Sequence, residues 1–580
     1  MVKVKQLSEP KTKIDVDICE SRKIHEDFFK TLEFKHCEDT ISLLTAILPT
    51  KFRGKTCTID SGHILLKWVP NTPSSNDGLL TVKNGNQEQT LNIYQKKIPL
   101  IDPFQWLKYK ETTVLPFSWK NQSDKVLDAE NQAYIDILGS SLVSKINKIY
   151  NSPHFCKFYG CFRAVAENYK YDLKDDLEDI RFTTWFWNAV ENNEFVLNMV
   201  EKSTGKKLSL EEIKQNMKPD DEYLEDSDSE SESESGSESE YESESGSEYE
   251  SKLQSDFELK LEEIINIKNI DLEEVTFDDK NDESTEPILL NKKRGLTQDS
   301  VSTDSSSYSI YDDYDIFIEL PQMPIAVMYI EKCEGTLDEI LESEITPIKT
   351  LDDEKKWCAW LFQIIAALCQ VQDALRLTHN DLHTNNILWK KTNDEFLYYK
   401  DSLGLSYKIP TYGYIFTIID YGRAIFSINN FYCISSDYQD GNNAAGQYNF
   451  GPIEDEDEKR VYPNKSFDLS RLSCSLIRGL FPYNPATKVN GKIITKDHGF
   501  EIRETNHELF NLLWLWLKSD NGENILEKYD GSEKFPGFDL YIEIAHHVKE
   551  AVPRVQLSHP AMKCFLVNDI PKDCKPIIIP

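Results

Sequence analysis

The stretch from residue 352 to residue 389 constrains the fold of this chain more than any other. Residues 352–377 read DDEKKWCAWLFQIIAALCQVQDALRL and predict a long buried helix, which Asp352 or Asp353 can cap. Its apolar side chains recur at helical spacing: Trp357, Trp360, Leu361, Ile364, Leu368 and Val371. The polar loop THNDLHTNN follows, and then the apolar run NILW. A loop this polar between two buried elements is expected to carry chemistry.

The rest of the chain divides into a β-rich front and a helical back. The front contains strand-like runs such as HILLKWV, GLLTV and LNIYQKKIPLI, which turn clusters separate. The last third contains helix-like runs such as FDLSRLSCSLIRGLF, HELFNLLWLWLK and LYIEIAHHVKEAV. This order predicts an α+β protein with two lobes.

Changes in composition suggest where the parts begin and end. We expect a charged N-terminal segment over residues 1–39, an N-terminal lobe over 40–345 and a C-terminal lobe over 346–580. An insertion is expected over 166–310, ordered around FTTWFWNAVENNEFVLNMV and disordered through the acidic tract 219–251.

The charge is strongly negative, and much of it is local. The formal net charge is −34, and residues 220–250 contain 15 acidic and no basic side chains. Such a tract repels itself and buries little apolar surface. An acidic chain is a poor match for nucleic acid, so we expect no nucleic-acid partner, whereas the tract can attract basic partners.

Cysteine usage and hydropathy indicate the compartment. The twelve cysteines form no CxxC pair, which is typical of reduced thiols in an intracellular protein. We find no run of 18 or more apolar residues and no apolar leader at the start, so neither a membrane span nor secretion is expected.

Two short motifs carry the strongest functional signal. His379-Asn380-Asp381 is followed five residues after the aspartate by Asn386, and Asp420-Tyr421-Gly422 ends the later apolar run YIFTII. This order resembles the protein kinase superfamily, with its HxD-x4-N catalytic loop and a DFG-like triplet. The resemblance implies an ATP-dependent phosphotransferase in which Asp381 orients the acceptor hydroxyl, while Asn386 and Asp420 hold Mg²⁺ against the phosphates of ATP.

Three further sequence segments extend the resemblance to protein kinases. AVMYIEKCEGTLDEIL is similar to the last N-lobe strand and hinge, with Ile330 as gatekeeper and Glu331 to Cys333 facing adenine. AENQAYIDIL is similar to helix αC, with Glu130 as ion-pair partner of the ATP-orienting lysine. FDLSRLSCSLI is similar to the helix whose leading Asp468 holds the catalytic-loop backbone, and His379 is expected to brace that loop.

Two placements of the ATP-orienting lysine compete. LNIYQKKIPLI resembles the VAIKK phrase of kinases and gives Lys96, with PNTPSSNDG (including Ser74, Ser75 and Gly78) as the phosphate loop. A hairpin of TCTI and HILLK would give Lys67 instead. We choose Lys96, because it leaves the shorter connection to Glu130. Strand alternation allows only one of Lys96 and Lys97 to enter the cleft. We expect Lys96→Met to abolish turnover with stability preserved.

The sequence departs from the kinase pattern at several positions, and these departures leave more than one class of phosphate acceptor to consider. His383 stands where Ser/Thr kinases have lysine, Asn380 replaces the arginine of HRD, and the GxGxxG and APE motifs are absent. The leading hypothesis is a Ser/Thr protein kinase that acts on a protein substrate. The alternatives are a small-molecule kinase of the aminoglycoside- or choline-kinase type and a pseudokinase scaffold.

A narrower resemblance concerns origin. KKIPLIDP and IPTYGYIFTIIDYGRAIF resemble the divergent kinase-like proteins of giant DNA viruses of the mimivirus type. This resemblance implies a viral protein that is located in the host cytoplasm or in the virion.

Overall fold

The computed structural model describes residues 26–39, 63–72, 75–103, 106–107, 117–173, 177–219, 313–343 and 348–580, the last range with gaps at 429–430, 441, 443, 452 and 529. Three predictions therefore concern residues outside the described ones. These are the disorder of the acidic tract beyond residue 219, the position of Ser74 and the alternative strand TCTI.

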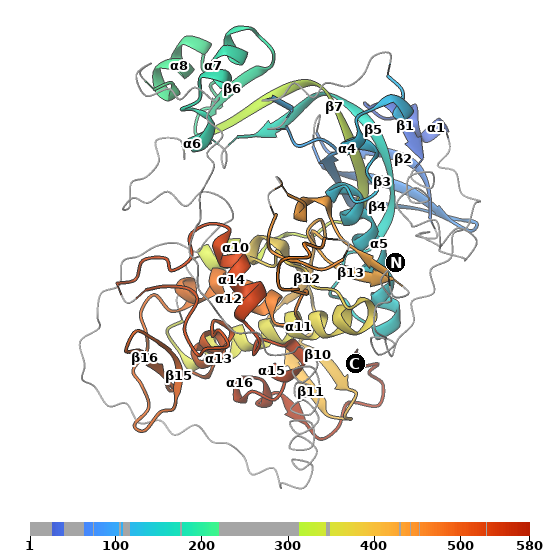
Figure 1. The fold of residues 1–580 in the computed structure, drawn as a ribbon. Helices are drawn as coiled ribbons and strands as arrows, with labels where there is room; N and C mark the ends of the chain where they lie inside the picture. Colours follow the sequence, from blue (N-terminus) through green and yellow to red (C-terminus); the bar gives the residue numbers. More distant parts are fainter. Residues whose placement is uncertain are drawn as a thin grey trace. The chain divides into compact units, whose positions relative to one another are not determined.

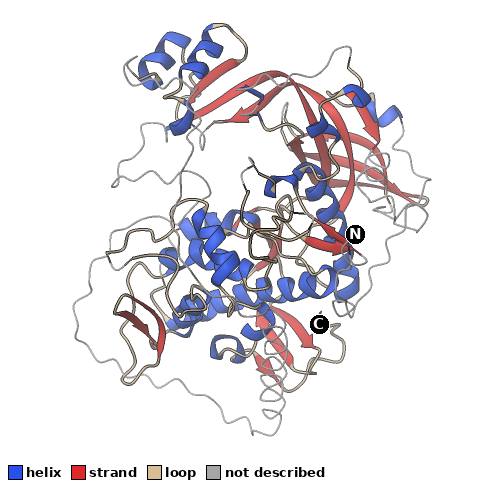
Figure 2. Ribbon diagram, viewed as in Figure 1, coloured by secondary structure: helices blue, strands red, loops and turns tan. Residues whose placement is uncertain are grey.

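An antiparallel sheet forms the N-terminal part. Its strands are β1 (Lys35–Asp39), β2 (Ile64–Pro70), β3 (Asp77–Asn84), β4 (Gln87–Pro99), β5 (Phe158–Asp172), β6 (Val196–Glu201) and β7 (Tyr314–Glu331). The order is β1-β5-β7-β4-β3-β2, and β6 pairs with the start of β7. The sheet is curled (Figure 2), and β7 runs beside β5 along most of its length (Figure 1).

Helices lie on the sheet and make up most of the C-terminal part. They are α1 (Glu26–Phe29), α4 (Asp124–Leu127), α5 (Gln132–Tyr150), α6 (Leu177–Ile180), α7 (Thr184–Glu191), α8 (Leu210–Met217), α10 (Leu337–Glu342), α11 (Leu351–Leu375), α12 (Phe467–Leu480), α13 (Glu508–Trp516), α14 (Asp539–His547), α15 (Pro553–Gln556) and α16 (Pro560–Lys563).

Short strands accompany these C-terminal helices. They are β8 (Gly335–Thr336), β9 (Ile387–Lys391), β10 (Phe396–Asp401), β11 (Ser406–Pro410), β12 (Tyr414–Ile418), β13 (Phe426–Ile428), β14 (Phe431–Cys433), β15 (Ile493–Asp497), β16 (Phe500–Arg503), β17 (Leu566–Val567) and β18 (Ile577–Ile579). A curled antiparallel sheet with a helical C-terminal part confirms the predicted α+β class.

The long predicted helix is α11, and it is buried. Its N-cap is Thr350, which forms a capping box with Asp353, so the predicted cap at Asp352 or Asp353 was wrong. The hydroxyl of Thr350 accepts a hydrogen bond from the backbone amide of Asp353, and the carboxylate of Asp353 accepts one from the backbone amide of Thr350. By length and composition α11 is apolar enough to cross a membrane, but 94% of its most apolar window is buried in the fold. Its apolar character is therefore explained by its place in the core.

Helix α5 approaches the C-terminal part closely. It begins after Asn131, whose side chain accepts the amide of Ala133. A Cβ atom at Gly139 would lie 2.6 Å from the Cβ atom of Tyr421, so a larger residue would push α5 away. This glycine brings the buried face of α5 against the turn at 420–422.

Two elements of the sheet bear on the predicted boundaries at residues 39 and 166. Within the predicted N-terminal segment, β1 pairs with β5. Phe28 of α1 is buried against Phe162 and Tyr329, so this segment contributes to the core of the sheet. Strand β5 passes through residue 166, the expected start of the insertion, without a break. Its pairing with β7 continues to Asp172, so ladder hydrogen bonds override the polar composition of this segment.

His154 joins three elements in the core. Its Nδ1 atom lies 2.9 Å from the carbonyl oxygen of Phe416 on β12, and its Nε2 atom lies 2.8 Å from the hydroxyl of Tyr399 on β10. The side chain is fully buried, and this burial lowers its pKa from 6.5 to about 4. The folded protein therefore holds a neutral imidazole.

This burial predicts a loss of stability in mild acid. Below pH 6.5 a proton binds the unfolded chain in preference to the fold, so the stability contributed by His154 falls as the pH drops from 6.5 toward 4. At pH 5 the penalty is about 2 kcal/mol. His154→Gln should be less stable at pH 7, but it should lose about 2 kcal/mol less between pH 7 and pH 5 in urea unfolding. Parallel pH profiles of the two proteins would contradict this assignment.

Candidate functional site

Antiparallel pairing of β9 and β12 brings the two polar motifs together. Ile387 at the start of β9 lies opposite Ile418 at the end of β12. The ladder continues one step further, because the amide of Ile419 donates to the carbonyl oxygen of Asn386 at 3.1 Å. The loop that precedes β9 and the turn that follows β12 are therefore neighbours.

A buried carboxylate fixes the loop. The backbone amides of His379 and Asn380 both donate to Asp468 at 3.0 Å, which confirms the predicted role of this aspartate at the start of α12. The predicted brace is also confirmed, since His379 Nε2 lies 2.8 Å from the carbonyl oxygen of Ile419. Asn380 adopts a left-handed backbone and donates to the carbonyl oxygen of Arg423 at 3.0 Å. The loop is thus tied to both α12 and the turn.

Hydrogen bonds orient the amide of Asn386. Its Nδ2 donates to the carbonyl oxygen of Asp381 at 2.9 Å and lies 3.1 Å from His383 Nε2. Burial lowers the pKa of His383 to about 4, so the ring is neutral and Nε2 can accept. With both amide hydrogens engaged, the oxygen Oδ1 of Asn386 remains as the group that can ligate a cation.

Lys96 joins the sheet, α5 and the turn. Its ammonium lies 2.7 Å from Asp136 Oδ2 and 2.9 Å from Asp420 Oδ1. Desolvation alone would lower the pKa of Lys96, but the two carboxylates outweigh it and raise the pKa. The other two candidate lysines point elsewhere: Lys97 pairs with Glu33, and Lys67 is exposed.

The expected partner of Lys96 was wrong. Glu130 lies in the turn before α5, and within the described structure the lysine pairs with Asp136 and Asp420. Asn131 caps the helix, which leaves Glu130 outside its first turn. Asp136 instead lies on the buried face, with a side chain 2% exposed, and it also accepts the amide of Tyr421 at 2.8 Å. A single acid among the apolar residues of AYIDIL was the signal for it.

Asp420 has an unusual backbone and a charged side chain. Its φ of 69° lies in the left-handed region, which an aspartate adopts at a cost that the surrounding contacts must offset. Desolvation would raise its pKa, but the Lys96 ammonium lowers it, so Asp420 is ionised. Its side chain is 42% exposed, far more than that of Asp136, so it can reach a ligand.

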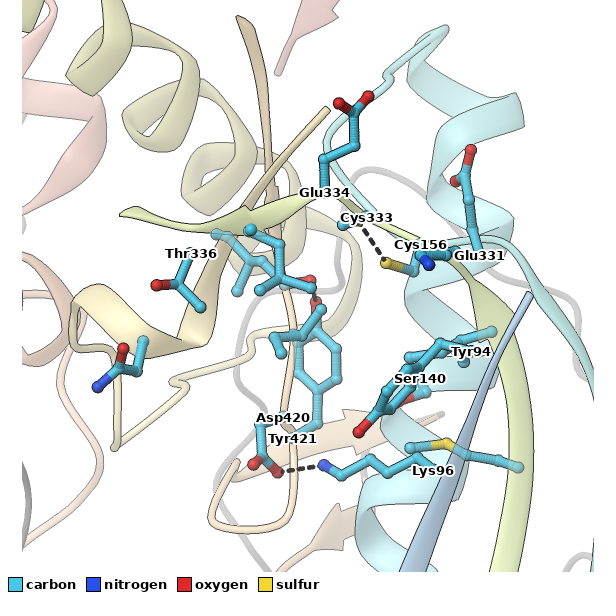
Figure 3. Close-up of a pocket in the computed structure, with 18 of the residues that line it drawn as sticks. Tyr94, Lys96, Ser140, Cys156, Glu331, Cys333, Glu334, Thr336, Asp420 and Tyr421 are labelled. Atoms are coloured by element: carbon cyan, nitrogen blue, oxygen red, sulfur yellow. Dashed lines mark hydrogen bonds and ion pairs between the residues drawn. The ribbon is translucent and has the colours of Figure 1, made fainter. Parts of the chain in front are cut away.

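A cavity of about 450 Å³ lies beside this cluster. Lys96 and Asp420 lie at one end, and the segment from Glu331 to Thr336 lines another wall (Figure 3). The apolar lining includes Val143, Met328, Ile330, Leu388 and Ile418. Glu331 and Cys333, the expected hinge residues, are thus in the cavity wall. The amide of Glu331 is already used, because it donates to the carbonyl oxygen of Lys157.

Asp381 lies apart from the cavity lining, under α14. The hydroxyl of Tyr541 donates to Asp381 Oδ1 at 3.0 Å and accepts from Arg471 Nε at 2.8 Å. Tyr541 is a neutral phenol, because desolvation raises its pKa. Asp381 is 8% exposed. Sequence reasoning missed this contact because the two residues lie 160 positions apart.

The oxygen groups present fit a magnesium ion. Asn386 Oδ1 and the Asp420 carboxylate are hard ligands on adjoining elements, and Mg²⁺ usually needs only one or two carboxylates beside phosphate oxygens and water. Among the described residues no cluster of three or more His, Cys, Asp or Glu side chains can hold a metal by itself. A magnesium ion at Asn386 and Asp420 would complete its coordination with water and with the oxygens of a bound phosphate.

The site thus belongs to an α+β protein with a lysine and two aspartates beside a cavity. No protein-family model matches the chain. Over 263 residues it is 28% identical to uncharacterized protein 098R of Invertebrate iridescent virus 6, and the match covers 42% of this chain. The chain spans less than half of the length of that relative, with 42% covered. The similarity is thus to a viral protein whose own role is not stated.

Removing the charge of Lys96 should destabilise the fold, contrary to the expectation from sequence. Lys96→Met leaves the buried Asp136 without its cation, which typically costs about 3–5 kcal/mol. Adding Asp136→Asn should recover part of the loss in urea unfolding, because the amide oxygen still accepts from Tyr421. Lys97→Met is the matched control, and its exposed pair with Glu33 is worth less than about 1 kcal/mol. Equal losses in the two lysine variants would contradict the network.

Proposed function

We propose that this protein is an ATP-dependent phosphotransferase with a two-lobed protein-kinase-like fold, acting on serine or threonine hydroxyls of a protein substrate. The observation that carries the proposal is the meeting of Lys96 and Asp420 at one end of the cavity, with Asn386 held in the loop directly before the adjoining strand β9. Each of these residues comes from a different chain segment, and the kinase resemblance assigned them to one phosphate site. The similarity to an iridovirus protein is in keeping with a viral origin.

The cavity suits a nucleotide. Its volume of about 450 Å³ is in the range of small-molecule sites, which are mostly apolar with a few polar groups. In this proposal the base lies between Ile330, Leu388 and the segment Glu331 to Cys333, and the phosphates extend toward Lys96. The ammonium would then exchange part of its contact with Asp420 for phosphate oxygens, while Asp136 keeps it in place.

Asn386 and Asp420 are the residues that would hold magnesium. When bound, this ion supplies positive charge against the phosphates. The protein contributes the preset orientation of both groups. The amide of Asn386 is fixed by its two hydrogen bonds, and the carboxylate of Asp420 by Lys96.

Asp381 would orient the acceptor hydroxyl. Phosphoryl transfer needs mainly positioning and charge stabilisation, so one fixed carboxylate is sufficient for this role. Tyr541 donates to Oδ1 and so fixes the orientation of the carboxylate, which in this proposal accepts the hydrogen bond of the incoming hydroxyl. His383 Nε2 lies 4.0 Å from Asp381 Oδ2, and burial lowers the pKa of this histidine to about 4 and so keeps its ring neutral. The positive charges that act on the carboxylate are those of Arg423 and Arg471.

A second candidate is a kinase of small-molecule hydroxyls, as in the aminoglycoside- and choline-kinase types. The observation that favours it is the enclosure of Asp381, whose side chain is 11% exposed beneath α14. A small acceptor reaches such a carboxylate more easily than a peptide does. Assays with peptide libraries and with amino-alcohol and aminoglycoside acceptors separate the two.

Phosphotransfer should depend on both aspartates. Asp381→Asn and Asp420→Asn should each lower turnover of labelled ATP by at least about a hundredfold, a loss of about 2.7 kcal/mol in transition-state stabilisation. The exposed Asp394 provides the control, since Asp394→Asn should leave turnover unchanged. Turnover should also require added magnesium. A wild-type chain that binds ATP without transferring phosphate would point instead to a pseudokinase.

Tyr541 should act on turnover through Asp381. Tyr541→Phe removes one hydrogen bond to a charged group, worth about 1.5–3 kcal/mol, so kcat should fall at least about tenfold while KM for ATP stays constant. Tyr438→Phe is the matched control, because that buried phenol donates to the carbonyl oxygen of Arg423 instead. If both variants behave alike, Tyr541 has only a structural role.

A further inference from the structure

Two thiols face each other in the wall of the cavity. The Sγ atoms of Cys156 and Cys333 lie 3.8 Å apart, and both residues line the cavity (Figure 3). Cys156 precedes β5 and is buried, whereas Cys333 follows β7 and is partly exposed. They are 177 positions apart in the chain, so the fold alone brings them together.

The backbone around this pair is already held in place. The amide of Glu331 donates to the carbonyl oxygen of Lys157 at 2.9 Å, and the Glu331 carboxylate accepts from the amide of Lys157 at 3.3 Å. Lys390 adds an ion pair to the same carboxylate at 3.2 Å. A disulfide has an S–S length of about 2.05 Å, so the sulfur atoms must approach by roughly 1.8 Å within neighbouring segments.

We propose that Cys156 and Cys333 form a peroxide-sensitive dithiol site, which oxidises to a disulfide in the wall of the cavity. The proposal rests on the distance between the two sulfur atoms and on the opening of Cys333 to the cavity. It is independent of what the cavity binds. The reagent is a small peroxide, which can reach Cys333 through the cavity.

The chemistry proceeds in two balanced steps. The thiolate of Cys333 attacks one oxygen of hydrogen peroxide, the O–O bond breaks, and one proton is taken up, which gives a sulfenic acid and water. The sulfur of Cys156 then attacks that of Cys333, the S–O bond breaks, and the thiol proton leaves with the hydroxyl as a second water. The two sulfur atoms supply the two electrons that reduce the peroxide.

The surroundings assign the first step to Cys333. The contact between the two sulfur atoms lowers the pKa of Cys333, the more exposed of the two thiols, and the Lys390 ammonium acts in the same direction. The same contact raises the pKa of Cys156, which is also desolvated. Cys333 is thus the attacking thiol and Cys156 the resolving one, because thiolate character and exposure govern reactivity.

Peptide mapping tests the site. The full-length protein is treated with hydrogen peroxide, its remaining thiols are alkylated, and its peptides are analysed by mass spectrometry without reduction. The expected product links the peptides of Cys156 and Cys333, has lost two thiol hydrogens and is restored by dithiothreitol. Cys564→Ser, which removes an exposed cysteine elsewhere, should give the same product.

Trapping of the sulfenic acid separates a dithiol site from a reactive single cysteine. Dimedone should label Cys333 strongly in Cys156→Ala and weakly in the wild type, where Cys156 removes the sulfenic acid. Cys333→Ser should give no linked peptide, and circular dichroism verifies that both variants are folded. Absence of the linked peptide in the wild type, or equal dimedone labelling with and without Cys156, would overturn the proposal.

Discussion

The ion pair between Lys96 and Asp136 is the contact on which the site depends. It connects a strand of the sheet to α5, and the same carboxylate accepts the amide of Tyr421 in the C-terminal part. A buried aspartate with a side chain 2% exposed tolerates its charge only with a cation and hydrogen bonds around it. The Asp136 carboxylate therefore holds the sheet, α5 and the turn in one arrangement, because burying it without Lys96 and the Tyr421 amide would destabilise the fold.

The four carboxylates of the site differ in burial and in hydrogen-bond partners, and these differences indicate different roles. Asp136 and Asp468 are buried and hold backbone amides, so they fix the turn and the loop. Asp420 is 42% exposed at the end of the cavity, and Asp381 lies under Tyr541. Two carboxylates thus serve the architecture, and the two that remain are the ones whose chemistry the proposed function requires.

Sequence reasoning identified what local spacing determines. The loop at 378–386 and the turn at 420–422 follow short polar patterns beside apolar runs. The contact of Asp468 with the loop, by contrast, was predicted from the kinase resemblance, because it joins residues 88 positions apart. Asp136 was missed because the position of Asn131 decides where α5 begins, and therefore which acid faces Lys96. Tyr541 and the dithiol pair were beyond reach, since distant segments meet there only through tertiary packing.

The pairing of β5 with β7 also bears on how the chain can vary in length. The two strands form the stem of a very long hairpin, with Asp172 opposite Phe317 at its outer end. Closing such a connection costs entropy that grows only with the logarithm of its length. Segments beyond Asp172 and Phe317 can therefore be gained or lost during evolution. The paired strands β5 and β7 keep the cavity at their other end in the same arrangement when this happens.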